Sequence, residues 1–264
     1  ESQKLKIKYK IKIKNIDLNL IGKIQLKNIL MAILAAKNSN IDLENILKTI
    51  PKLKSVNGRL ERIGKIKNKS IVILDYAHTP DALKTCLLNL REQFPDKKIS
   101  LLFGCGGNRD QNKRSKMGKI ASNYSDSIYL TDDNPRFENP EKIRRDIKKS
   151  INKKKVIEIS NRAEAISRAI KDLSTGQVLL VAGKGHEITQ EIGKRKIYLS
   201  DKKIILKEIK IKNLNLSDNL KLNIIKELAK IKKLPPSTTL KTARINSQEV
   251  NKNDIFFAIK GKKK

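Results

Sequence analysis

The chain has 264 residues, enough for one or two domains with cores of their own, and its formal net charge is +32. Aromatic residues make up only 4% of it and Trp is absent, so the cores must be aliphatic. No stretch reaches the ~20 apolar residues of a membrane-spanning helix, and no secretory segment opens the chain, so we expect a cytoplasmic protein with no membrane partner.

The positive charge by itself does not assign a function. An excess of this size suits nucleic acid or an anionic membrane surface. Lys, however, greatly outnumbers Arg and is spread along the whole chain, and few aromatic side chains are available to stack on bases. We therefore interpret most of the charge as solvated surface Lys and expect no nucleic-acid partner. A basic nucleic-acid-binding module remains the competing class.

Four residues that often carry chemistry give little support for a metal site. Cys86 and Cys105 belong to no CxxC pair or metal-ligand cluster, so we expect reduced thiols and no bound metal. His78 and His186 each follow a buried-strand pattern, where α/β folds place their ligands. They therefore mark candidate ligand loops.

The first elements in chain order are a strand and two helices. Strict alternation over 5–13 predicts a half-buried strand. Apolar residues at helical spacing predict a helix over about 26–37, with one apolar face, and a shorter one over about 42–50 that ends before Pro51. No turn precedes the first strand and no Met opens the chain, so we expect it to begin inside a domain.

From residue 59 onward strands alternate with helices, which predicts an α/β fold with a Rossmann-like, mostly parallel sheet covered on both faces. Thr79 followed by Pro80, and Ser160, are the expected N-caps. Such a sheet binds ligands at the carboxyl ends of its strands. The predicted strands are 59–66, 70–75, 98–103, 127–131, 155–159 and 177–182, and the predicted helices are 80–93, 114–123, 140–151, 161–173 and 201–210.

The composition changes after residue 211. Residues 212–222 have no clean period and predict a linker, which a helix over 220–232 should follow. A short alternating region then ends at Ile259. A domain that stopped there would have almost no core, so we expect the chain to end inside a domain as well.

Two of the strand-end loops contain residues suited to phosphates and carboxylates. In 75–81, Asp75 and His78 precede a helix N-terminus and suit the ribose and phosphates of a nucleotide, although Asp75 could equally serve only as a cap. In 103–110, three glycines in four positions allow close approach to a ligand, and Arg109 offers a bidentate fork. This loop does not have the P-loop pattern.

The two later loops have weaker individual signals. Residues 131–136 place a carboxylate, an amide and a guanidinium on one turn, which could hold the ammonium and carboxylate of an amino acid, or could be an ordinary Asp-Asn-Pro turn. In 182–187, Val178 stands where a P-loop needs its first Gly, so Lys184 is expected to be structural or a general anion contact.

Together these loops resemble the Mur ligases. The strings are DYAHTPDAL at 75–83, FGCGGNRDQNKRSKMG at 103–118, TDDNPR at 131–136 and VAGKGHE at 181–187. The resemblance is to the type that adds meso-diaminopimelate to UDP-N-acetylmuramoyl-L-Ala-D-Glu. It implies an ATP-dependent amide-bond ligase of peptidoglycan synthesis, monomeric, in which the D-Glu carboxylate becomes an acyl phosphate that the incoming amine attacks.

The resemblance also implies site residues. It assigns the diaminopimelate pocket to Arg109, Asp133, Asn134, Pro135, Arg136, Gly183 and Glu187. Lysine-adding members differ at the position of Arg136, so an Arg there implies an amino acid with an additional distal carboxylate.

On the ATP side, the resemblance assigns Arg59, Asp75, His78 and Asn28. The chain departs from the family pattern at 24 and 25, where Ile24 and Gln25 replace an aromatic residue or His followed by Asn. The family's P-loop and Mg²⁺ ligands would lie upstream of residue 1. We therefore expect no catalytic residue within this chain and no ligase activity from it alone.

The resemblance divides the chain into three parts. Residues 1–57 would be the tail of a central ATPase domain and 58–211 a C-terminal ligase domain. Residues 212–264 would be a linker and the start of a second ligase, because 243–261 resembles the first domain of the D-Ala-D-Ala-adding type. This suggests a fused two-ligase protein, although Asn246-Ser247-Gln248 departs from that family's Asp-Ser-Arg and a chance match is the alternative. A ligase similar to folylpolyglutamate synthase is the nearest rival.

Overall fold

The computed structural model describes residues 3–9, 12–152, 155–228, 243–244 and 255–256. By its internal contacts the chain divides into two units, Glu1–Ile209 and Lys210–Lys264. Within the described residues, no helix is both long enough and apolar enough to cross a membrane.

The chain opens with a β-hairpin. Strands β1 (Gln3–Tyr9) and β2 (Lys12–Leu18) pair antiparallel, with Leu5 opposite Ile16. The prediction of one strand over 5–13 is therefore wrong, since that range spans the end of one strand and the start of the next. Alternation alone could not locate the reversal, because no Gly or Pro marks a turn there.

Helices α1 (Lys23–Asn38) and α2 (Leu43–Thr49) and the 3₁₀ turn η1 (Ile50–Lys52) follow the hairpin. On the predicted apolar face of α1, Ile29 and Ile33 are buried, whereas Leu30 and Leu34 are exposed. Helical periodicity thus identified the face but overestimated its burial. The core of this region consists of Ile16, Leu18, Leu20, Ile29, Ile33, Ile46, Leu47 and Ile50.

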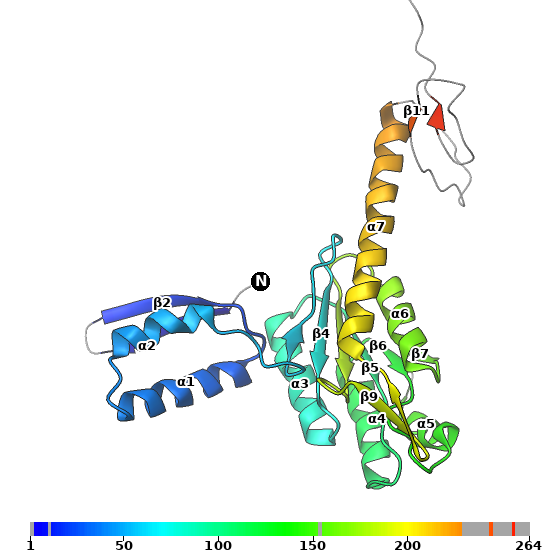
Figure 1. Ribbon diagram of the computed structural model, residues 1–264, viewed down its shortest axis with the longest axis horizontal. Coiled ribbons are helices and arrows are strands. Elements are labelled where there is room, and N and C mark those ends of the chain that lie inside the picture. Colours follow the sequence, from blue (N-terminus) through cyan, green and yellow to red (C-terminus); the bar gives the residue numbers. More distant parts are fainter. Residues whose placement is uncertain (1–2, 10–11, 153–154, 229–242, 245–254, 257–264) are drawn as a thin grey trace, which may run out of the picture. The chain divides into compact units, whose positions relative to one another are not determined.

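The predicted α/β fold is confirmed by a six-stranded sheet in the order β3-β4-β8-β5-β6-β7 (Figure 1). All neighbours pair in parallel except the antiparallel edge strand β3. Edge strand β3 has only two residues where 59–66 was predicted. The strands are β3 (Glu61–Arg62), β4 (Ile71–Asp75), β5 (Ile99–Phe103), β6 (Ser127–Leu130), β7 (Lys155–Glu158) and β8 (Val178–Ala182).

The strand order determines where the helices lie. The crossovers through α3 (Pro80–Gln93), α4 (Asn112–Tyr124) and α5 (Pro140–Lys148) all step toward the β7 edge, whereas α6 (Arg162–Asp172) leads back to β8. Because such crossovers are right-handed, a reversal of direction places α6 on the opposite face. Central strands β4, β5 and β8 are buried along their whole length, as expected for a sheet covered on both faces.

Two cap predictions have different outcomes. The Thr79 hydroxyl accepts a hydrogen bond from Ala82 N at the start of α3, as predicted. Helix α6, by contrast, is capped by Asn161, whose side chain accepts from Ala163 N and Glu164 N. Ser160, the predicted cap, instead uses its carbonyl to accept from Asp132 N. The cap lies one residue later because Ser160 is tied to the loop that follows β6.

Two elements near the end of the ligase-like region were not predicted. Strands β9 (Thr189–Ile192) and β10 (Arg195–Tyr198) form a hairpin directly after the β8 loop. Helix α7 (Asp201–Leu228) begins at the predicted residue and continues through 212–222, so the chain is helical where the lack of a clean period suggested a linker. Of the segment resembling a second ligase, the structure describes only β11 (Ala243–Arg244) and β12 (Ile255–Phe256), which pair in parallel, and the rest lies outside the described residues.

Candidate amino-acid site

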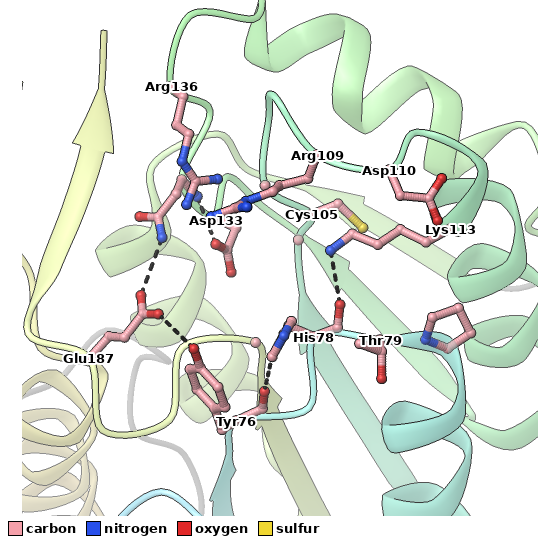
Figure 2. Close-up of a pocket in the computed structure, with 15 residues that line it drawn as sticks. Tyr76, His78, Thr79, Cys105, Arg109, Asp110, Lys113, Asp133, Arg136 and Glu187 are labelled. Carbon is pink, nitrogen blue, oxygen red and sulfur yellow. Dashed lines mark hydrogen bonds between the residues drawn. The ribbon is translucent and has the colours of Figure 1, made fainter. Parts of the chain in front are cut away.

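A cavity of about 500 Å³ opens at the carboxyl ends of β4, β5, β6 and β8 (Figure 2). The strand order brings the loops that follow these strands to one edge of the sheet, where parallel sheets bind ligands. The residues that line the cavity are Tyr76, His78, Thr79, Pro80, Gly104, Cys105, Gly106, Arg109, Asp110, Lys113, Asp133, Asn134, Arg136, Gly183 and Glu187.

The glycine-rich loop after β5 packs too closely on its neighbours to hold larger residues. A Cβ on Gly104 would collide with the Thr131 carbonyl oxygen, and one on Gly107 with the Pro135 carbonyl oxygen. This close packing lets the loop run along the 131–136 turn. It carries the exposed Arg109 to the cavity.

Asp133 presents an unpaired acceptor to the cavity. Its Oδ1 accepts from Asn134 N at 2.8 Å, but Oδ2 is buried and has no hydrogen-bond partner among the described residues. A Cβ on Gly183 would lie 2.7 Å from this Oδ2, and Gly183 has a φ of +112°, so glycine is required there for two reasons. A buried carboxylate oxygen without a donor is costly unless a ligand supplies one.

Arg136 is held from two sides. Its Nε donates to Glu191 Oε2 at 2.8 Å, and its Nη1 donates to the Gly107 carbonyl at 2.9 Å. Its backbone has a φ of +51°, which is uncommon for a residue with a side chain. The guanidinium is therefore fixed in direction beside Asp133 at the cavity (Figure 2).

Lys184 is fully buried and holds two of the cavity residues, Asn134 and Glu187, in place. Its Nζ donates to Asn134 Oδ1 at 3.0 Å, to Glu187 Oε2 at 2.8 Å and to the Thr189 carbonyl at 2.6 Å. All three hydrogens of the ammonium are thereby used within the protein. Of the two roles expected for Lys184, this geometry favours the structural one over a general anion contact.

Glu187 is a stabilised carboxylate. Burial alone would raise the pKa of Glu187, but the hydrogen bonds and charge of Lys184, with further hydrogen bonds from Asn134 and Tyr76, offset this and lower the pKa below its ordinary value. Asn134 Nδ2 donates to Glu187 Oε2 at 3.2 Å. Glu187 is therefore ionised at neutral pH, with its lone pairs only partly used.

Tyr76 is a site residue that sequence reasoning missed. Its hydroxyl donates to Glu187 Oε1 at 3.3 Å, and its ring lies beside the rings of His78 and His186, with centroid distances of 4.6 and 5.1 Å. The Arg59 guanidinium carbon lies 4.8 Å from the same ring centroid. Its position between Asp75 and His78 in a strand-end loop was the available signal.

Not all sequence-predicted site residues line the cavity. Arg109, Asp133, Asn134, Arg136, Gly183, Glu187 and His78 do so. Pro135 is buried and does not line the cavity, and its carbonyl lies against Gly107. Both Asp75 oxygens accept backbone hydrogen bonds at 2.7 Å, from Leu60 N and Ala77 N, so this carboxylate fixes two loops.

Asn28 and Arg59, the remaining residues assigned to ATP, are connected by two long hydrogen bonds through Gln25. Asn28 Nδ2 donates to Gln25 Oε1 at 3.4 Å, and Gln25 Nε2 donates to the Arg59 carbonyl at 3.5 Å. Gln25, which departs from the family pattern, thus connects the other two. Among the described residues, no group of three or more His, Cys, Asp and Glu is placed to hold a metal ion.

The ionic lining of the cavity is balanced. The cations Arg109, Lys113 and Arg136 face the carboxylates Asp110, Asp133 and Glu187. A site with both signs in fixed positions suits a zwitterion better than a purely anionic or cationic ligand.

Comparison with known proteins identifies the domain. Residues 58–185 match the family model "Mur ligase, glutamate ligase domain". Over 198 residues the chain is 43% identical to the UDP-N-acetylmuramoyl-L-alanyl-D-glutamate–2,6-diaminopimelate ligase of Rickettsia rickettsii, covering 75% of this chain and 40% of that protein. The chain thus spans about two fifths of the length of this relative.

Solved structures agree in fold. A structure of UDP-N-acetylmuramoyl-L-alanyl-D-glutamate–2,6-diaminopimelate ligase superposes with a TM-score of 0.63 at 32% identity, covering 79% of this chain and 43% of that one. Folylpolyglutamate synthase of Thermotoga maritima shares the fold at a TM-score of 0.51 and 22% identity, covering 64% of this chain and 38% of the other. The family match, the relative and the ligase structure agree, and residues 58–185 of this chain are therefore a Mur ligase C-terminal domain.

Proposed function

We propose that the chain provides the amino-acid-binding part of an ATP-dependent ligase that adds meso-diaminopimelate to UDP-N-acetylmuramoyl-L-Ala-D-Glu. The observation that carries this proposal is the buried Asp133 Oδ2, which has no hydrogen-bond partner in the described parts of the chain and shares a cavity of balanced charge with two arginines. An ammonium would supply the missing donor, and a carboxylate would pair with the arginines. The names of the diaminopimelate-adding relatives support the same assignment.

In this proposal each end of the ligand has its own partners. Asp133, with Glu187, would hold an ammonium group, while Arg109 and Arg136 would take carboxylates. The Lys184 hydrogen bonds keep Asn134 and Glu187 in place before the ligand arrives. Preorganised partners of this kind would hold the reacting amine in one orientation, which is the main contribution a binding domain makes to the rate.

ATP would supply the phosphoryl group that activates the acceptor carboxylate. Arg59 and His78 are exposed beside the Tyr76 ring, where they suit anionic phosphates, and Asn28 would lie near the base. Asp75 would act indirectly, because its hydrogen bond to Leu60 N fixes the segment that carries Arg59. We assign Mg²⁺ and the P-loop to residues outside this chain, and for that reason expect the chain alone to have no ligase activity.

We also propose an oligomeric state, a location, partners and domain boundaries for the protein. We infer a monomeric cytoplasmic protein with the two substrates named above as its partners, and no nucleic acid or membrane. The three-part division at 57/58 and 211/212 and the fusion to a second ligase remain proposals from the sequence resemblance.

The test is calorimetric titration of the 264-residue chain with meso-diaminopimelate and with lysine, which lacks the distal carboxylate. We expect the wild type to prefer diaminopimelate, and Arg136→Ala to weaken its binding at least about tenfold, because one partly buried charge contact is removed. Lysine binding should not change in this variant.

Arg145→Ala is the matched control, since Arg145 is exposed on α5 and pairs only with Glu141 among the described residues. It should bind both ligands as the wild type does. Equal wild-type affinity for diaminopimelate and lysine would refute the role given to Arg136. Salt-sensitive binding of nucleic acid that is indifferent to Arg136→Ala would favour the rival basic module.

A further inference from the structure

The β9 strand holds the 133–136 turn along its whole length. Gln190 Nε2 donates to the Asp133 carbonyl at 2.6 Å, and Glu191 N donates to Asn134 Oδ1 at 3.0 Å. Arg136 N donates to the Glu191 carbonyl at 3.0 Å, and Gly193 N donates to the Arg136 carbonyl at 2.7 Å. The turn that carries the ligand-binding residues is therefore paired like an extra strand on the β9–β10 hairpin.

Glu191 adds a side-chain contact to this backbone pairing. Its Oε2 accepts from Arg136 Nε at 2.8 Å, and its Oε1 lies 3.5 Å from Lys196 Nζ on β10. The pair is only partly exposed, with side-chain exposures of 22% for Arg136 and 30% for Glu191. The attraction between the two charges is therefore stronger than in a fully solvated surface pair.

The contact determines which part of the guanidinium remains available. Nε is bound to Glu191 and Nη1 to the Gly107 carbonyl, while Nη2 has no hydrogen-bond partner within the described part of the chain. An Arg side chain loses rotamer entropy when it is fixed. Glu191 makes much of that loss occur on folding, before a ligand binds.

We propose that Glu191 is a positioning and specificity-determining residue, which aims the free edge of Arg136 at the distal carboxylate of the amino acid. This inference rests on the proposed function of the cavity. The opposite effect would be competition, in which the Glu191 carboxylate occupies the guanidinium in place of the ligand. The two effects predict opposite signs when Glu191 is removed.

Calorimetric titration of the 264-residue chain distinguishes them. Glu191→Ala removes both charge and acceptor, and it should weaken meso-diaminopimelate binding about fivefold, which corresponds to ~1 kcal/mol of side-chain ordering. Glu191→Gln keeps an oxygen acceptor for Nε, and its affinity should return to within about twofold of the wild type. Lysine binding should be unchanged in both variants.

Glu141→Ala is the matched control, because it makes the same chemical change at an exposed position on α5. Unchanged or tighter diaminopimelate binding by Glu191→Ala would overturn the inference while leaving the proposed function intact. An equal loss of lysine binding would also overturn it, since that would indicate general damage to the turn. If the wild-type chain bound neither amino acid, both the proposed function and this inference would be refuted.

Discussion

At the scale of single residues, one buried ion pair lies at the end of β8, next to the loop that lines the cavity. Arg162 and Asp201 are both fully buried, and Arg162 Nη2 donates to Asp201 Oδ2 at 2.7 Å and to the Ala182 carbonyl at 2.9 Å. The pair connects the starts of α6 and α7 to the end of β8, immediately before Gly183. It therefore fixes the strand end from which the 183–187 loop departs.

This geometry predicts a large effect for Asp201→Ala. Removing one partner leaves a buried guanidinium charge unpaired, so we expect a loss of about 3–5 kcal/mol in the free energy of unfolding, measured by urea titration. The control is Glu141→Ala, which breaks the exposed pair with Arg145 on α5. The ion-pair part of that change should be below about 1 kcal/mol. Similar losses in both variants would show that burial does not govern the pair.

At the scale of elements, the caps of the helices are set partly by tertiary contacts. Asn161 caps α6. The carbonyl of the neighbouring Ser160 instead accepts hydrogen bonds from the loop after β6. Helix α6 carries Arg162 in its first turn. The start of α6 therefore holds the end of β8, through the hydrogen bond from Arg162 to the Ala182 carbonyl.

We expect Asn161→Ala to lower the free energy of unfolding by about 1 kcal/mol, because two backbone N–H groups lose their acceptor. Ser160→Ala should change it by less than about 0.5 kcal/mol, since Ser160 contributes its backbone carbonyl, which alanine retains. Chemical denaturation of both variants provides the comparison. The reverse ranking would restore Ser160 as the cap.

At the scale of the whole molecule, acid should destabilise the fold, and Glu187 is one identifiable contributor. The folded state lowers the pKa of Glu187 despite its burial, because the hydrogen bonds from Lys184, Asn134 and Tyr76 outweigh the desolvation. A carboxyl with a lowered pKa contributes stability that is present above its ordinary value, about 4.5, and is lost as pH falls through the folded value. The molecule already carries +32, so further protonation also increases repulsion.

Urea midpoints measured from pH 7 to pH 3 should therefore fall on the acid side. In Glu187→Gln the wild-type advantage should be present at neutral pH and diminish below pH 4.5. Glu141→Gln, at an exposed position, should follow the wild-type curve. A wild-type advantage over Glu187→Gln that persisted undiminished at the lowest pH would contradict the lowered pKa.

The sequence by itself determined the class of fold and most of its elements. Buried aliphatic runs such as 71–75 and 178–182 are local patterns, and so are the Thr79 cap and the glycines of 104–107. The resemblance to Mur ligases then named the residues of the pocket. Local pattern could not place the reversal between β1 and β2, because nothing in the side-chain period changes at a turn without Gly or Pro.

Only the tertiary structure decided which of these residues meet. The insertion of β8 between β4 and β5 brings the 182–187 loop to Tyr76 and to the 131–136 turn, which lies some 50 residues away in the chain. The same packing occupies both oxygens of Asp75, and it leaves one oxygen of Asp133 without a donor among the residues that the structure describes. It also sets Glu191 against Arg136. Hydrogen bonding at such separations depends on strand order and packing, which no local periodicity encodes.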